Sequence, residues 1–173
     1  MNYEKLFTPM KIGKMEVKNR LSFSPMGTNS AFTNGRKDEQ EIDYFIRRAK
    51  GGVGMIVNGC QMLNEAIAQG SMEGYLDSYS VLPALTSMVD GVHRYGARII
   101  CQISPGTGRN AFPDTNGNPP MSASAIPSAF DPNVICHALT KDEISNIMKM
   151  TEFAAGVARD AGYDGIEIHA HAG

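Results

Sequence analysis

Long apolar runs, paired cysteines and blocks of like charge are all absent from this sequence of 173 residues. No stretch approaches the roughly 20 apolar residues that a membrane-spanning helix needs, and the segment after Met1 lacks the apolar core of a secretory signal. Lysine and arginine are scattered and the net charge is only −2, so no broad field favours nucleic acid or an anionic membrane. These absences predict a cytoplasmic protein of one domain that binds neither.

The three cysteines are too far apart to suggest a disulfide framework or a chelating pair. Cys60, Cys101 and Cys136 are separated by 41 and 35 residues, which fits no metal-binding or redox motif. We therefore expect three free thiols. His169 and His171 could share a metal, since imidazole is the commonest metal ligand. However, no cysteine or carboxylate is obviously placed to complete a tetrahedral set, so no metal site is predicted.

Four short apolar segments alternate with helical patterns along the chain. Strands are predicted at residues 20–24, 55–58, 98–103 and 165–169. Pro25 and Gly27 should end the first strand, and Gly59 the second. A long excursion over residues 104–139 carries six of the nine prolines. Loops of that length are usually functional or disordered.

The first and last helices carry the clearest start signals. Asp38 with Glu41, and Thr140 with Glu143, have the spacing of a capping box, and Gly51 supplies a stop for the first helix. The last helix has one apolar stripe that should face the core. It comprises Ile144, Ile147, Met148, Thr151, Ala154, Ala155 and Ala158.

Buried strands that alternate with helices predict a parallel α/β sheet, either doubly wound or a (β/α)8 barrel. A dinucleotide-binding unit should carry G-x-G-x-x-G after its first strand. Here residues 24–29 read SPMGTN, and no Walker A sequence occurs anywhere. The barrel is therefore favoured. A typical barrel needs roughly 250 residues, so four strands predict the N-terminal half of one.

The chemistry of a barrel lies at the carboxyl ends of its strands. The residues at those ends are Pro25, Met26, Gly27 and Thr28, then Asn58, Gly59 and Cys60, then Gln102 and Ser104, and finally Glu167, His169 and His171. An amide that can pair with a ring edge, a glycine for close backbone approach and imidazole donors suit a flat heteroaromatic ligand. Each also has an ordinary explanation, because glycine permits a turn and methionine fills cores.

Taken together and in order, these residues resemble the old yellow enzyme family of NADH:flavin oxidoreductases. The matching blocks are LFTPMKIG at 6–13, VKNR at 17–20, SPM at 24–26, IVNG at 56–59, Gln102-Ile103, SASAIP at 122–127, LTKDEI at 139–144 and AGYDGIEIH at 161–169. The resemblance covers essentially the whole chain. Within the family, the chain resembles the long bacterial members most, namely the 2,4-dienoyl-CoA reductase-like and bile-acid-type enoate oxidoreductases.

The resemblance implies a β-hairpin across the barrel floor and an FMN site above it. Backbone at Pro25, Met26 and Gly27 would lie against the flavin ring, Gly59 would approach its pyrimidine edge, and Gln102 would hydrogen-bond that edge. NAD(P)H would reduce the flavin, which would pass hydride to an activated C=C bond of an enone or enoyl substrate. His169 matches the family's first donor to the substrate carbonyl.

The chain departs from the family pattern at three places. The second carbonyl donor should follow His169 by three residues, where Ala172 stands, and His171 lies one residue earlier. The segment 102–109 is one residue longer than the family's and lacks its histidine. The family's proton-donating tyrosine would come directly after Gly173. The barrel's phosphate site, and the iron–sulfur cluster and FAD domain of the longer relatives, would also lie beyond residue 173.

Two other functions are compatible with the same fold. A half-barrel has open strand edges, which favour pairing with another chain, so it could act as a binding or assembly module without catalysis. Alternatively, a barrel lyase or isomerase without flavin could use Glu167 and His169 as acid and base.

Overall fold

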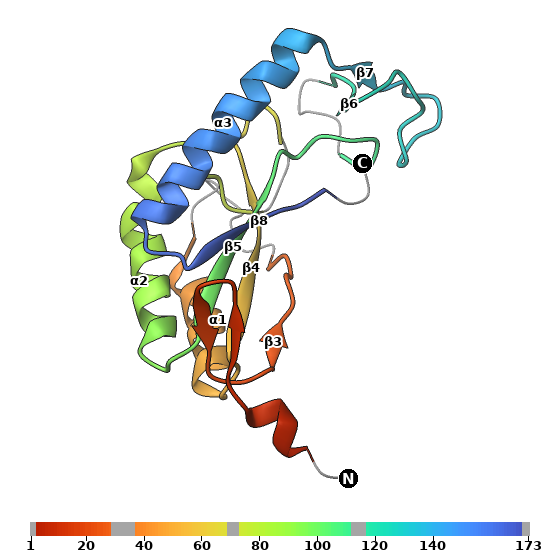
Figure 1. The fold of residues 1–173 in the computed structure, drawn as a ribbon. Coiled ribbons are helices and arrows are strands. Elements are labelled where there is room, and N and C mark those ends of the chain that lie inside the picture. The colour runs from red at the N-terminus through yellow and green to blue at the C-terminus, as the bar shows by residue number, and fades with distance from the viewer. Residues whose placement is uncertain (1–2, 29–36, 69–72, 112–116, 171–173) are drawn as a thin grey trace.

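The computed structural model describes residues 3–28, 37–68, 73–111 and 117–170 of the chain. Its centre is a four-stranded parallel sheet in the order β3-β4-β5-β8. The strands are β3 (Ser22–Phe23), β4 (Met55–Met62), β5 (Arg98–Ser104) and β8 (Gly165–Ile168). Helices α1 (Glu39–Lys50), α2 (Leu82–His93) and α3 (Lys141–Asp160) all cover the same face (Figure 1).

This arrangement confirms the predicted half-barrel. A doubly wound sheet reverses its strand order at a switch point and carries helices on both faces. Here the strands follow one another in chain order, and in the described part of the chain α1, α2 and α3 leave the opposite face of the sheet uncovered. That opposite face corresponds to the interior of a barrel.

The second strand is longer than the sequence indicated. The prediction that Gly59 ends it is wrong, because β4 continues to Met62 with a register shift between Asn58 and Gln61. The Gly59–Cys60 peptide bond within this stretch is cis. Backbone partners sustain the extension on both edges. Met62 pairs with Ser104 of β5 on one side, and its N–H donates to Gly74 O at 2.8 Å on the other.

Both predicted helix starts are present. The Asp38 side chain accepts the N–H of Glu41 at 2.8 Å and begins α1. The Glu41 side chain forms a buried ion pair with Lys37. Thr140 and Glu143 form the complete capping box of α3, which satisfies backbone donors that the first turn would otherwise leave free.

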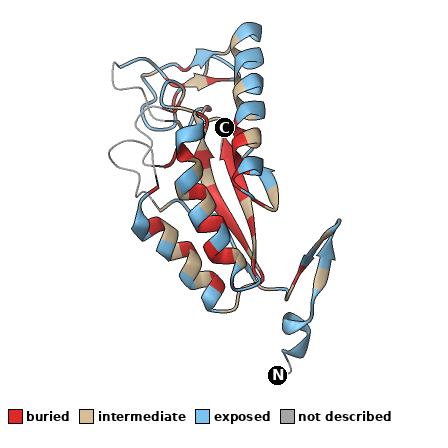
Figure 2. Cartoon of the chain, turned by 90° about the vertical axis from the view of Figure 1, so that its left-hand side faces the viewer, coloured by how far each residue is buried: buried red, intermediate tan, exposed pale blue. Residues whose placement is uncertain are grey.

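The hydrophobic core lies between the sheet and the helices (Figure 2). Its fully buried members include Phe45, Ile56, Leu85, Met88, Val89, Ile99, Ile103 and Val157. The apolar stripe of α3 is buried only in its second half. Ala154 and Ala158 are inaccessible to solvent, whereas Met148 is 67% exposed, because the first turns of α3 extend beyond the carboxyl end of the sheet (Figure 1).

The predicted hairpin is formed by β1 (Met10–Ile12) and β2 (Met15–Val17), which pair in antiparallel fashion. It is held at the amino end of the sheet, the floor of the barrel. Arg98, the first residue of β5, donates from Nε to Glu16 O at 3.0 Å. Lys18 Nζ donates to Tyr95 O at 2.6 Å.

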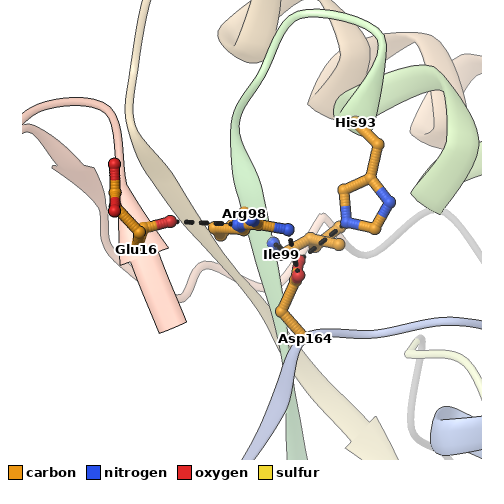
Figure 3. Close-up of polar contacts among 5 residues, drawn as sticks. All are labelled: Glu16, His93, Arg98, Ile99 and Asp164. Atoms are coloured by element: carbon orange, nitrogen blue, oxygen red, sulfur yellow. Dashed lines mark hydrogen bonds and ion pairs between the residues drawn. The ribbon is translucent and has the colours of Figure 1, made fainter. Parts of the chain in front are cut away.

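One carboxylate organises the same floor (Figure 3). Asp164, just before β8, accepts a hydrogen bond from Arg98 Nη1 at 2.9 Å and from the N–H of Ile99 at 2.8 Å. It also lies 2.7 Å from His93 Nε2 at the end of α2. The Asp164 side chain thus joins β8, β5 and α2 at the amino end of the sheet, opposite to the carboxyl ends of the strands where the candidate site lies.

The long excursion after β5 contains a second small sheet. Strands β6 (Met121–Ser122) and β7 (His137–Ala138) pair in parallel above the carboxyl end of the main sheet. Short 3-10 turns, η1 (Glu4–Phe7) and η2 (Tyr79–Val81), precede β1 and α2. No helix in the described residues is long and apolar enough to cross a membrane.

Candidate functional site

Three polar or small residues meet at the carboxyl end of the sheet. Gly59 on β4 lies against Gln102 on β5, and Gln102 pairs in register with Glu167 on β8. Successive side chains of a strand point to opposite faces. Cys101 and Ile103 belong to the core on the helix side, so Gln102 faces the uncovered side. The strand order therefore brings these predicted site residues together.

Gln102 is fixed by both neighbours. Its Nε2 donates to Glu167 Oε1 at 2.5 Å. A Cβ atom on Gly59 would collide with the Gln102 side-chain oxygen and would lie 2.9 Å from its Cβ. The missing side chain at position 59 is thus what lets Gln102 lie flat against β4. The amide keeps its second N–H and further acceptor capacity for a ligand.

The residues that follow β3 are exposed at the same end of the sheet. Pro25, Met26 and Gly27 all lie on the surface. The Met26 side chain turns outward to α1, where its sulfur accepts from Tyr44 Oη at 3.8 Å. The predicted contact of this segment with a flavin ring therefore involves its main-chain atoms, and it stays a prediction.

His169 follows β8 at the same edge. Its backbone N–H donates to Ile103 O at 2.8 Å, which extends the pairing of β8 with β5 by one residue. The side chain is half-buried. His171 lies outside the described residues, and its predicted role stays a prediction.

Asn58 and Gln61 face the helices instead of the site. Asn58 is fully buried and accepts the phenol O–H of Tyr163 at 2.8 Å. Burial raises the pKa of Tyr163 well above its usual value, so this donor stays protonated. Asn58, which belongs to one of the blocks that carried the resemblance, braces the core.

The cysteines are free thiols with limited reactivity. Cys101 is buried on the core side, and burial raises its pKa to about 12. Cys60 is half-buried at the site end of β4, where burial, and then the charge of Glu73, raise its pKa. Since the thiolate is the nucleophile, neither group is prepared for nucleophilic catalysis.

The chain matches the model of the NADH:flavin oxidoreductase / NADH oxidase family over residues 5–173. It belongs to this family. Solved structures share the fold of this chain. Old yellow enzyme from Pichia sp. AKU4542 superposes with a TM-score of 0.83 at 25% identity, over 95% of this chain and 45% of that one. The half-barrel is therefore part of an old-yellow-enzyme TIM barrel.

Two further proteins are similar to this chain. Cinnamate reductase of Clostridium sporogenes is 36% identical over 97% of this chain and 26% of its own length. The structure of a 2-naphthoyl-CoA reductase with 2-naphthoyl-CoA superposes with a TM-score of 0.85 at 29% identity, over 96% of this chain and 27% of that one. The chain thus spans about a quarter to a half of the length of these three proteins.

Sequence reasoning missed one residue that lies at the carboxyl end of β3. Glu73 lies against Gly27, with its carboxyl carbon 3.2 Å from the position of a Cβ on that glycine, and its charge acts on Cys60. Glu73 stands in a polar stretch between β4 and η2 that has neither motif nor periodicity. Nothing in the sequence pattern indicates that it reaches the end of β3.

Proposed function

We propose that this chain forms the first half of an FMN-dependent enoate reductase that takes its electrons from NAD(P)H. The observation that carries the proposal is the fixed row of Gly59, Gln102 and Glu167 on the helix-free face, in a chain of the NADH:flavin oxidoreductase family. The remaining strands, the phosphate site, and an iron–sulfur cluster and FAD domain are proposed to lie beyond residue 173. The similarity to cinnamate reductase supports an activated C=C bond as the substrate group.

The donor set of the site fits a flavin ring. Gln102 offers an amide, which can both donate to and accept from the pyrimidine edge, and its contact with Gly59 keeps the side chain flat. The exposed backbone at Pro25, Met26 and Gly27 is accessible to a planar ligand. Bound FMN would supply hydride transfer from NAD(P)H to the β-carbon of the alkene.

His169 is proposed to assist the substrate. A donor at the carbonyl oxygen stabilises the negative charge that develops as the β-carbon is reduced. His169 is held at the end of β8 by its backbone bond to Ile103, two residues after Glu167 of the same strand. Glu167 already accepts a hydrogen bond from Gln102. We therefore propose that Glu167 orients the Gln102 amide and does not act as a catalytic base.

The direct test uses the complete protein that contains this chain. It should purify with a flavin absorption band, and denaturation should release FMN. NADH or NADPH should bleach the band without oxygen, and an α,β-unsaturated carbonyl compound such as cinnamate should restore it, whereas its saturated analogue should not. A colourless protein that cannot be loaded with FMN would refute the proposal. It would favour the binding module or the Glu167–His169 lyase.

A further inference from the structure

The carboxylate of Glu73 occupies the space beside Gly27 at the end of β3. Any side chain at position 27 would collide with Glu73 Oε1, and its Cβ would lie 3.2 Å from the carboxyl carbon. Gly27 itself is exposed, but Glu73 is only 7% exposed. The acidic group is therefore packed against the backbone at the site and does not extend into solvent.

The backbone after Glu73 is anchored firmly enough to hold it there. Gly74 O accepts the N–H of Met62 at 2.8 Å, and the N–H of Leu76 donates to Met62 O at 2.9 Å. Since β5 occupies the other edge of β4 at Met62, this segment lies on the edge that faces β3. Leu76 is buried in the main core. The segment thus continues the sheet where β3 has stopped.

A buried negative charge acts more strongly on its surroundings than an exposed one. Coulomb energies rise several-fold as water is replaced by protein. The charge of Glu73 is the second cause, after burial, of the raised pKa of Cys60, while a backbone hydrogen bond and the charge of Lys37 act in the opposite direction. A redox group placed against Gly27 would likewise lie close to the Glu73 carboxylate.

We propose that Glu73 lowers the reduction potential of the flavin through the negative charge of its carboxylate beside Gly27. The inference rests on the proposed function, which places the flavin ring against the backbone of Pro25–Gly27. Uptake of two electrons and one proton, supplied by NAD(P)H or by a chemical reductant, leaves the flavin one unit more negative. An adjacent carboxylate opposes that added charge, so the oxidised form is favoured.

The test is a reductive titration of the complete FMN-loaded protein against a reference dye. Glu73→Gln keeps the size of the side chain and removes the charge. We expect the midpoint potential to become more positive, with the ratio of reduced to oxidised flavin raised about tenfold or more at a fixed potential. Glu73→Asp retains the charge and should stay close to the parent value.

Two further variants make the test specific. Glu65→Gln makes the same charge change at an exposed carboxylate eight residues earlier and should leave the potential unchanged. Gly27→Ala is compatible with the local backbone, which is not in a left-handed conformation, and its new methyl group must displace the Glu73 carboxylate. It should shift the potential in the same direction as Glu73→Gln, and the double variant should shift it no further.

The outcomes separate the two proposals. A complete protein that binds no FMN overturns the proposed function. A protein that binds FMN with the same potential in the parent, Glu73→Gln and Gly27→Ala overturns the role of Glu73 alone, as does an equal shift in Glu65→Gln. If Glu73→Gln fails to fold, Gly27→Ala carries the test by itself.

Discussion

Gln102 shows how single residues at this site depend on their neighbours. Its position at the end of a predicted strand indicated a ring-edge ligand, and the structure places it on the helix-free face of the sheet. Its two contacts were not foreseeable, because they depend on which residues of β4 and β8 stand opposite in register. Gly59 was expected to permit close approach of a ligand, yet the side chain that approaches it is Gln102.

Replacing Gln102 by Leu should weaken FMN binding by about 1–3 kcal/mol, because a hydrogen bond to the ring edge is lost and its buried partner is left unsatisfied. The measurement is the dissociation constant of FMN for the refolded apoprotein. Gln61→Leu is the matched control, since Gln61 is equally buried but faces the helices, and it should retain the flavin normally. Equal affinities in the parent and Gln102→Leu would contradict the assignment.

His169→Ala should separate the two half-reactions of the complete enzyme. Loss of a donor to the developing oxyanion should slow alkene reduction by about 10²-fold or more, while reduction of the flavin by NAD(P)H should change much less. Stopped-flow measurements of each half-reaction provide the comparison. His137→Ala removes an exposed imidazole at the surface of the excursion and should change neither rate. An unaltered alkene rate in His169→Ala would show that the residue has another role.

At the scale of elements, local signals in the sequence were reliable and pairing partners were not. Capping boxes and glycine stops need only residues three or four positions apart, so the starts of α1 and α3 could be predicted. The length of β4 depends on residues 74–76, which return to pair with it after the strand should have ended. The exposed first half of α3 likewise reflects the limited height of the sheet, which no helical periodicity encodes.

The capping box of α3 predicts a pH dependence. The pKa of Glu143 is lowered from 4.5 to about 2. The hydrogen bond from the backbone N–H of Thr140 is the main cause, followed by the hydrogen bonds with the His137 imidazole and the Thr140 hydroxyl. A lowered folded-state pKa means that the carboxylate stabilises the helix fully above pH 4.5 and progressively less as the pH falls towards 2.

An NMR titration of the Glu143 carboxyl measures this directly. Thr140→Ala should raise the pKa of Glu143 only partly, because the backbone N–H of residue 140 remains. The difference in stability between the parent and Glu143→Gln should shrink as the pH falls from 4.5 to 2. A carboxyl that titrates at its ordinary value in the folded protein would exclude the capping interaction.

At the scale of the whole molecule, β3 and β8 are the open edges of an incomplete barrel among the residues that the structure describes. Ile166 and Ile168 on β8 are 41% and 55% exposed. They pair in register with Cys101 and Ile103, which face the core. The uncovered apolar side chains of this edge therefore lie on its helix-facing side, beside a groove formed with Ala155 and Gly156 of α3.

We predict that residues 1–173, expressed alone, self-associate in a concentration-dependent manner, since open strand edges and exposed apolar side chains favour pairing. Sedimentation velocity at several concentrations measures this. Ile168→Lys should reduce association, whereas Ile12→Lys on the exposed hairpin should not. A monodisperse species of 18.7 kDa at all concentrations would contradict the prediction.

The position of the core bears on how the protein can fold while it is being synthesised. The core lies between sheet and helices, and each helix contacts the strand of the sheet that follows it in the chain, α1 with β4, α2 with β5 and α3 with β8. As the ribosome releases the chain, each β–α unit can thus dock onto the one before it. The topology thus permits assembly in the order of synthesis, and in a longer protein Ile166 and Ile168 would await the next helix to emerge.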